Sequence, residues 1–162
     1  LSHRIGWLWR LHAVHHSDTE LDATTTHRHH PLESAASALV TLPVLLVLAP
    51  PWGAVLAYST LGVVVSTCSH GNLKLPTWLD RALAWVIVTP AYHRVHHSAW
   101  QSQTDSNYAT VLTCFDRLLR TASPLAQDGG RSLTIGLEQG RDRTSQSLTH
   151  LLASPFRRAA LG

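Results

Sequence analysis

Apolar and polar positions divide the chain into three parts. Residues 32–65 form an apolar run rich in Leu, Val and Ala, in which Glu33 is the only charged residue. The sequence Pro-Pro-Trp-Gly at 50–53 interrupts this run, because proline cannot continue a helix and glycine frees the backbone. The pattern therefore predicts two apolar helices, at about 35–49 and 54–68, joined by a tight turn.

The two predicted helices fit either of two settings. Each would extend about 22 Å, and a few further residues would bring it close to the roughly 30 Å hydrocarbon core of a bilayer. One interpretation is a buried hairpin in a soluble helical protein. The one we favour is a hairpin that enters the membrane and returns. Basic residues flank the run on both sides, which predicts that both flanks lie in the cytoplasm. They are Arg4, Arg10 and Arg28 before the run and Lys74, Arg81 and Arg94 after it.

Outside the hairpin the pattern is weaker. Residues 82–88 form a third apolar stretch, too short to cross a bilayer. We expect it either at the membrane interface, where Trp78, Trp85 and Trp100 would suit, or packed beneath the site. The part beyond residue 125 is rich in Gly, Ser and Arg, and there we expect a soluble tail with a short strand at 133–135 and a helix at 145–152. The predicted fold class is all-α, a membrane-embedded helical bundle, with residues 1–125 as its main domain and 126–162 as its C-terminal tail.

Composition narrows the class of protein further. Charged residues make up 14% of the chain, against roughly 25% in soluble domains, and 12 His stand beside 13 Lys+Arg and 10 Asp+Glu. The pI is about 9.3, but the basic residues form no stripe interleaved with aromatic residues, so we expect no nucleic-acid partner. Cys68 and Cys114 lack Cys-x-x-Cys spacing, and we expect buried apolar residues rather than a disulfide. We identify no signal peptide and expect the protein to continue upstream of Leu1.

The histidines are concentrated in two clusters that repeat one another. Leu-His-Ala-Val-His-His-Ser at 11–17 and Tyr-His-Arg-Val-His-His-Ser at 92–98 share the pattern His-x-x-His-His-Ser. On a helix, positions i, i+3 and i+4 lie on one face, so the three imidazoles of each cluster can converge on one volume. Two such clusters predict a histidine-ligated metal site. Its proposed ligands are His12, His15 and His16 from the first cluster and His93, His96 and His97 from the second.

Three other histidines are candidate ligands. His3 lies nine residues before His12, half a helical turn out of phase, so it can join the site only if the helix breaks near Gly6. His70 ends the second apolar segment, where an unused imidazole would be costly. Of the three histidines at 27–30 only His30, fixed before a proline, is a candidate, and we expect the other two to be solvated.

The number of imidazoles indicates two metals close together, because one ion takes only four to six ligands. Imidazole accommodates Fe, Zn, Cu and Ni, so ligand type alone does not choose the metal. An all-histidine dimetal site facing a membrane favours iron that activates O₂, since insertion into a C–H bond needs a redox metal and a dry cavity. The second ring nitrogens need acceptors that fix their tautomers, and we expect Asn72 and Asp116, with Asn107, in that role.

These motifs resemble the fatty acid hydroxylase / sterol desaturase superfamily of membrane di-iron oxygenases. Its bacterial branch carries L-W-R-x-H-x-V-H-H-S, then R-x-H-P-L-E, H-x-N, T-P-x-x-H-R-V-H-H-S, N-Y and W-D-R-L. This chain carries them at 8–17, 28–33, 70–72, 89–98, 107–108 and 115–118, with Phe115 in place of the Trp. The match covers residues 1 to about 121.

The resemblance implies a helical membrane fold with a histidine-rich cap on the cytosolic side. It implies two non-haem Fe ions, O₂ as co-substrate, and hydroxylation or desaturation of a lipid or isoprenoid C–H bond. It further implies an electron donor such as cytochrome b5 or a ferredoxin. By the same resemblance His3 corresponds to the second His of the family's first box, H-R-x-x-H, and His70 to the extra ligand between the two later boxes.

The chain departs from the family pattern in three ways. The first His of the first box would fall two residues before Leu1, the preceding transmembrane helices lie outside this sequence, and Arg120 stands where the family usually has Gly before Thr121. An inactive fragment is therefore one alternative, and a non-catalytic membrane protein that stores or transports metal is a second. A zinc hydrolase, the third, would need a carboxylate inside its metal motif, as in H-E-x-x-H, and neither cluster has one.

Overall fold

The computed structural model describes residues 1–126 and 128–157, and within them the regular structure is helical, which confirms the predicted all-α class. Extended pairing in these residues is limited to two isolated bridges, Ile87 with Leu112 and Ser98 with Ile135. In chain order the elements are α1 (Gly6–His16), η1 (Ala23–His27), α2 (Pro31–Leu48), α3 (Trp52–His70), α4 (Thr77–Leu83), α5 (Pro90–His96), α6 (Gln101–Thr104), α7 (Cys114–Leu118), α8 (Leu148–Ala153) and η2 (Ser154–Phe156).

The two apolar helices are α2 and α3. Helix α2 begins four residues before and ends one residue before the predicted limits, and α3 extends two residues beyond them at each end. The His30 side chain caps α2 by accepting a hydrogen bond from the Leu32 amide, and Pro31 occupies the first helical position. The helix ends where Ala49 adopts a left-handed conformation, with φ of 40°, before two prolines. With 18 and 19 residues the helices are about 27 Å long or slightly more, near the thickness of a hydrocarbon core.

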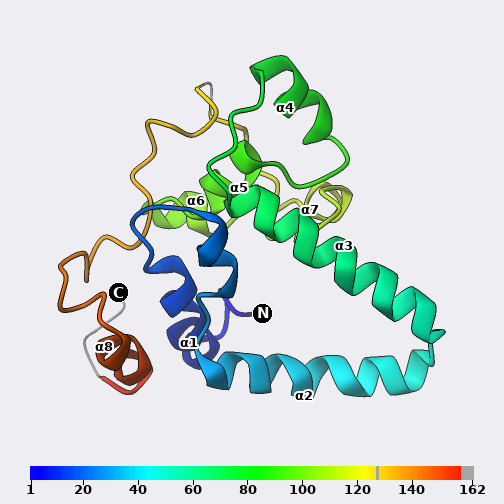
Figure 1. Ribbon diagram of the computed structural model, residues 1–162, viewed down its shortest axis with the longest axis horizontal. Helices are drawn as coiled ribbons and strands as arrows, with labels where there is room; N and C mark the ends of the chain where they lie inside the picture. The colour runs from blue at the N-terminus through cyan, green and yellow to red at the C-terminus, as the bar shows by residue number, and fades with distance from the viewer. Residues whose placement is uncertain (127, 158–162) are drawn as a thin grey trace.

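The hairpin is an open V rather than a packed pair. Figure 1 shows that α2 and α3 meet at their turn and diverge toward the rest of the molecule. Both helices have the length and composition needed to cross a membrane, and only 6% and 11% of their apolar windows are buried. Leu39 is 77% exposed and Val47 84%. In the described residues neither helix therefore serves as the buried core of a soluble domain.

The remaining helices form a cap at the mouth of the V. The C-terminal half of α3 packs against η1 and α5, and the first turns of α2 pack against α1. A small apolar core supports this arrangement. It consists of Val65, Ala84, Val88, Tyr92 and Val111. Because this core fixes α5 against α3, it brings the second histidine cluster close to His70.

The C-terminal segment runs back along the cap. Helix α8 starts three residues later than predicted, and η2 after it packs on α1. The Gln146 side chain donates a hydrogen bond to the Ser17 carbonyl, which ties the tail to the end of the first cluster. Of the strand predicted at 133–135 only the single bridge of Ile135 forms.

Two expectations about the cysteines have different outcomes. Cys68 and Cys114 form no disulfide, as predicted, but both are exposed, so the prediction that they are buried was wrong. Cys68 lies on α3, whose apolar residues mostly face outward rather than into a protein core. An apolar residue pattern identifies the helix here but not what covers it.

Candidate metal centre

Three helix ends carry the histidine side chains into one volume. Helix α1 begins at Gly6, so His3 lies in the turn before it, as the break predicted there requires. Thr89 caps helix α5, because its hydroxyl accepts a hydrogen bond from the Tyr92 amide, and Pro90 is the first residue of the helix. His70 is the last residue of α3.

Eight histidines form two groups of four. In each group, every residue places one ring nitrogen within 4.8 Å of the corresponding nitrogens of the other three. We call the first group site A; it consists of His3, His12, His16 and His96. We call the second group site B; it consists of His15, His70, His93 and His97. Each histidine cluster of the sequence therefore contributes to both sites. Neighbouring residues of a helix point about 100° apart, so the adjacent pair His15 and His16 is divided between site B and site A, and the pair His96 and His97 between site A and site B.

The ring nitrogens within each site face one another. In site A, Nε2 of His16 lies 3.2 Å from Nε2 of His12. In site B, Nε2 of His70 lies 3.2 Å from that of His15 and 3.0 Å from that of His93. Two imidazoles bound to one metal at about 2.1 Å are separated by about 3.0–3.4 Å, so these spacings suit a shared ion. The rings of His16 and His97 stack with centroids 4.4 Å apart, which makes the two sites direct neighbours.

Several of these nitrogens are buried without a hydrogen-bond partner among the described residues. The His97 side chain in site B is fully buried, and neither of its ring nitrogens is bonded; in site A, Nε2 of His3 is likewise buried and unbonded. Burying a polar atom without a partner costs free energy, and native structures do so rarely. A metal ion in each site would satisfy such lone pairs. The residues present therefore fit a pair of metal ions.

Burial keeps these imidazoles neutral, the state that binds metal. It lowers the pKa of His15, His16, His93 and His97 well below the usual 6.5, and the other imidazoles nearby lower it further. The same causes lower the pKa of His96 to about 4. At neutral pH each ring then offers a lone pair rather than a second N–H.

Acceptors around the sites fix the tautomers of three ligands. Nδ1 of His12 donates to the Glu33 carboxylate at 2.6 Å. Nδ1 of His70 donates to the Ser66 carbonyl, and Nδ1 of His96 to the Ser106 carbonyl, both at 2.8 Å. With the proton on Nδ1, the lone pair is on Nε2, the nitrogen that faces the neighbouring imidazoles in these contacts.

The residues expected to provide these acceptors have other partners. Asn72 accepts from Arg94, and Asn107 joins the Tyr92 carbonyl to the Ser123 amide. The Asp116 carboxylate accepts four hydrogen bonds, none of them from a histidine among the described residues. Its donors are the Tyr92 and Thr121 hydroxyls and the Tyr108 and Ala109 amides. These three residues hold the loops around α5, and in the part of the chain that the structure describes none of them is hydrogen-bonded to an imidazole.

His30 also lies outside both sites. One of its nitrogens caps α2, and Nε2 contacts the Leu152 carbonyl of α8. The fixed backbone before Pro31, which suggested a ligand, instead places the imidazole where a helix cap is needed. Eight of the nine histidines predicted as ligands are brought together, and His30 is the exception.

Glu33 and His29 were not predicted as part of the site. Glu33 bridges Nδ1 of His12 and Nδ1 of His29, the latter at 2.9 Å, and these three residues form a further group of possible ligands. His29 is exposed, as expected, but its ring stacks on His15 with centroids 4.4 Å apart. One signal could have identified Glu33: it is the only charge in the apolar run, and a carboxylate at such a position needs a partner.

A cavity of about 430 Å³ lies over the two sites. Ligands of both sites line it, together with Ser66 and Ser69 of α3, Tyr108, and His29 just before α2. The cavity therefore lies where the two arms of the hairpin leave the cap.

Comparison with known proteins gives consistent similarities. The sequence model described as "Fatty acid hydroxylase" matches residues 1–121. An ornithine lipid hydroxylase, OlsE, from Rhizobium tropici is 34% identical over 127 residues, which cover 75% of this chain and 36% of that protein. Alkylglycerol monooxygenases from Xenopus tropicalis and Homo sapiens are 28% and 26% identical, over 76% and 75% of this chain and 27% and 26% of theirs. The chain thus spans about a quarter to a third of these relatives. No solved structure matches it significantly.

Proposed function

This chain belongs to the fatty acid hydroxylase family, and from that premise we propose that sites A and B hold two non-haem iron ions and that the protein hydroxylates a lipid C–H bond with O₂. One observation carries the proposal. Eight buried imidazoles converge in two adjacent sets of four at the mouth of an apolar hairpin. Neutral imidazole is a good iron ligand, and bound iron would supply the redox chemistry that activates O₂.

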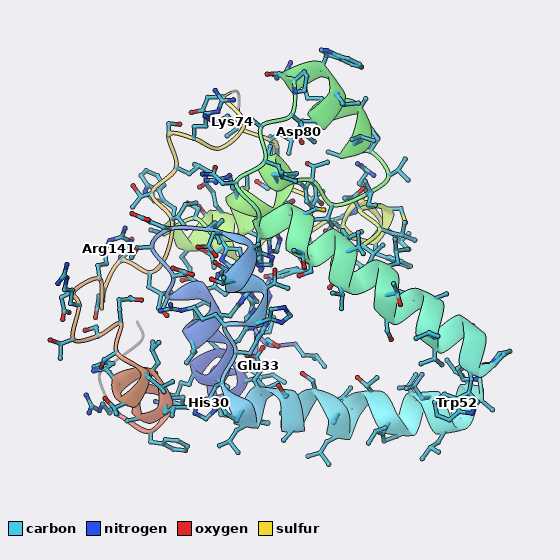
Figure 2. All side chains as sticks on the ribbon, viewed as in Figure 1. His30, Glu33, Trp52, Lys74, Asp80 and Arg141 are labelled. Carbon is cyan, nitrogen blue, oxygen red and sulfur yellow. The ribbon has the colours of Figure 1, made fainter. Side chains whose placement is uncertain are left out.

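Hydrogen bonds within the protein orient the imidazoles for metal binding. The acceptors on Nδ1 of His12, His70 and His96 hold Nε2 toward the site before any metal binds, so little ordering remains to be done on binding. Figure 2 shows Glu33 at the start of α2, beside α1. Glu33 therefore links the hairpin to the ligand set of site A.

The hairpin and the cavity are suited to bind an apolar substrate. In our proposal α2 and α3 lie in the membrane, and a lipid or isoprenoid chain enters the cavity between them. The exposed leucines and valines of both helices suit contact with lipid, and the cavity reaches ligands of both sites. The burial of the imidazoles excludes bulk water from the reacting region, as insertion into a C–H bond requires.

The orientation, the electron donor and the reaction type belong to the same proposal. Basic residues on both flanks of the hairpin support a cytoplasmic cap, where cytochrome b5 or a ferredoxin could deliver electrons. Hydroxylation is favoured over desaturation, because the similar proteins are a lipid hydroxylase and monooxygenases.

The deciding experiment is metal analysis with Mössbauer spectroscopy on the full-length protein in detergent. We expect two irons per chain with a coupled spectrum. His16→Ala in site A and His93→Ala in site B should each lose iron and the coupling, whereas His27→Ala, which changes an exposed histidine outside both sites, should retain both. One tightly held zinc, or no metal in a folded protein, would exclude the di-iron proposal.

A further inference from the structure

A second cavity, of about 420 Å³, lies on another side of α5 and shares no lining residue with the cavity over the metal sites. Its walls come from the segment at 19–21, from the loop after α3, from α4, from the first turns of α5 and from residues 129, 131 and 135. Figure 2 shows Lys74 and Asp80, which line it, far from Trp52 at the turn of the hairpin. Its volume is within the range of small-molecule binding sites.

One wall of this cavity is basic. Arg94 is half-buried, and its guanidinium donates to Oδ1 of Asn72 at 3.3 Å. Arg131 lines the same cavity, and its charge adds to burial in lowering the pKa of Arg94. Lys74 adds a third cation on the exposed rim. Like charges gathered in one cavity repel, and an anion between them would relieve that repulsion.

The backbone at Gly130 packs closely against the side chain of Arg94. Gly130 has φ of +80°, and a Cβ at this position would lie 2.9 Å from Cβ of Arg94. Only glycine allows both this conformation and this approach. The stem of Arg94 is therefore confined on one side, and its position does not depend on contacts with solvent alone.

Two carboxylates provide the opposite charge in the cavity: Glu20, which is exposed at its rim, and Asp80, which is buried. Asp80 is the one without access to bulk water. Its side chain is 7% exposed, and Oδ1 is buried without a hydrogen-bond partner among the described residues. No described cation lies within ion-pair distance of this carboxylate, although three cations line the same cavity. A buried carboxylate without a partner is costly, and such a group is satisfied by whatever binds beside it.

We propose that this cavity binds a zwitterion, whose phosphate or carboxylate contacts Arg94 and Arg131 and whose ammonium group contacts Asp80. Charges of both signs line one small cavity without pairing with each other in the described residues, and a ligand with both charges satisfies each of them. Such a zwitterion is found both as the headgroup of a membrane lipid and as a free solute. This site does not depend on the iron proposal, because binding is measured without turnover.

The test is calorimetric titration of the full-length protein in a non-ionic detergent with three probes. Glycerophosphoethanolamine and 5-aminopentanoate carry both charges, whereas glycerophosphoglycerol carries only the anion. We expect the two zwitterions to bind, and glycerophosphoethanolamine to bind at least tenfold more tightly than glycerophosphoglycerol, as expected for one charged hydrogen bond. Arg94→Gln should weaken every probe, and Asp80→Asn should remove the tenfold preference.

Two control variants and a competition experiment are needed, the latter to distinguish a lipid headgroup from a free solute. Glu138→Gln and Arg143→Gln make the same changes at exposed positions outside the cavity and should bind the probes like the wild type. Competition by vesicles containing phosphatidylethanolamine would support a lipid headgroup as the natural source, and lack of competition a free solute. The proposal is overturned if no zwitterion binds up to about 10 mM, or if Asp80→Asn keeps the preference. It is also overturned if Asp80→Asn lowers Tm by more than about 3 °C, since Asp80 would then be structural.

Discussion

The cap and the hairpin of this protein invert the usual distribution of polar and apolar residues in opposite ways. In the cap, imidazoles are buried, with His16 1% and His97 0% exposed. In the hairpin, large apolar residues are exposed, with Leu39 77% and Val47 84%. A soluble domain would bury the leucines and expose the histidines. Each inversion supports one part of the proposed function: metal ions inside the cap, and lipid around the hairpin.

The comparison also separates two sources of stability. The exposed apolar side chains of the hairpin are stable in contact with lipid but unfavourable in water, so the stability of the hairpin depends on the surrounding bilayer. The cap depends on its small apolar core and on polar contacts at the ends of helices. A change confined to one region should therefore affect one source of stability and leave the other intact.

Acidification should have the largest effect, and it should act on the cap when the metal has been removed. The pKa values of His15, His16, His93 and His97 are well below 6.5 in the folded protein, and that of His96 is about 4. Below pH 6.5 the unfolded chain therefore binds more protons than the folded one, and stability falls as the pH falls. Each such histidine contributes a loss of up to about 1.4 kcal/mol per pH unit until the pH reaches its folded pKa.

This prediction is measured as the Tm of chelator-treated protein between pH 7.5 and 5. We expect a steep decrease below pH 6.5, which His16→Ala makes shallower by about one proton and His27→Ala, a change at an exposed histidine, leaves unaltered. A Tm that stays constant over this range would show that the imidazoles are not held neutral in the cap.

A charge in the hairpin should have the next largest effect. Leu39 lies near the middle of α2 and is exposed. Leu39→Asp should disfavour membrane insertion by about 3 kcal/mol, the cost of an aspartate at the centre of a transmembrane helix. Carbonate extraction of membranes should then release a larger share of the variant. Leu148→Asp changes a leucine of similar exposure in α8 and should be retained like the wild type. Equal retention of Leu39→Asp would place α2 outside the bilayer.

The sequence predicts some levels of this structure better than others. Spacing predicts which histidines come together, because residues three and four apart on a helix must share a face, and eight of the predicted histidines do converge. The same reasoning cannot divide them between sites A and B, since that depends on how α1, α3 and α5 pack against each other. It also placed His30 in the site, because a residue before proline can serve equally as a ligand or as a helix cap.

The acceptors around the ligands were the least predictable part. Two of them are the backbone carbonyls of Ser66 and Ser106, and a carbonyl is present at every residue, so no side-chain pattern indicates it. Asn72, Asn107 and Asp116 were chosen for their polarity, but their polar atoms hold neighbouring loops instead. The open angle of the hairpin is also absent from the sequence pattern, because both arms are apolar on all sides.

Glu33 joins the two regions, and its substitution should have a smaller effect than either change above. Glu33→Gln keeps the shape but weakens the charged hydrogen bond to Nδ1 of His12. We expect site A to bind its metal about 10–100-fold more weakly, as found for changes to groups that orient metal ligands, while site B is unchanged. Metal release to a chelator should therefore become biphasic. Glu138→Gln, at an exposed position, provides the control, and single-phase release from Glu33→Gln would contradict the orienting role.

The smallest effect should come from Arg120, which follows helix α7 in a left-handed conformation with φ of 57°. Its amide donates to the Arg117 carbonyl, and the Thr121 amide to the Asp116 carbonyl at 2.7 Å, the hydrogen bonds of a Schellman motif. Glycine is the usual residue at this position of the motif, which gives a physical reason for the glycine expected there from the family resemblance. Arginine in this conformation is strained.

Arg120→Gly should therefore stabilise the cap by about 0.5–1 kcal/mol, because relief of strain of about 1–2 kcal/mol exceeds the additional entropy that glycine loses on folding. The gain should raise Tm by about 2 °C, without altering membrane retention or metal content. Arg120→Ala removes the same side chain but keeps the strain, so it should give no such gain. If both variants raise Tm equally, the arginine side chain rather than its backbone conformation destabilises the cap. A gain for glycine alone would show that the cap, unlike the hairpin, is limited by the same local backbone rules as a soluble protein.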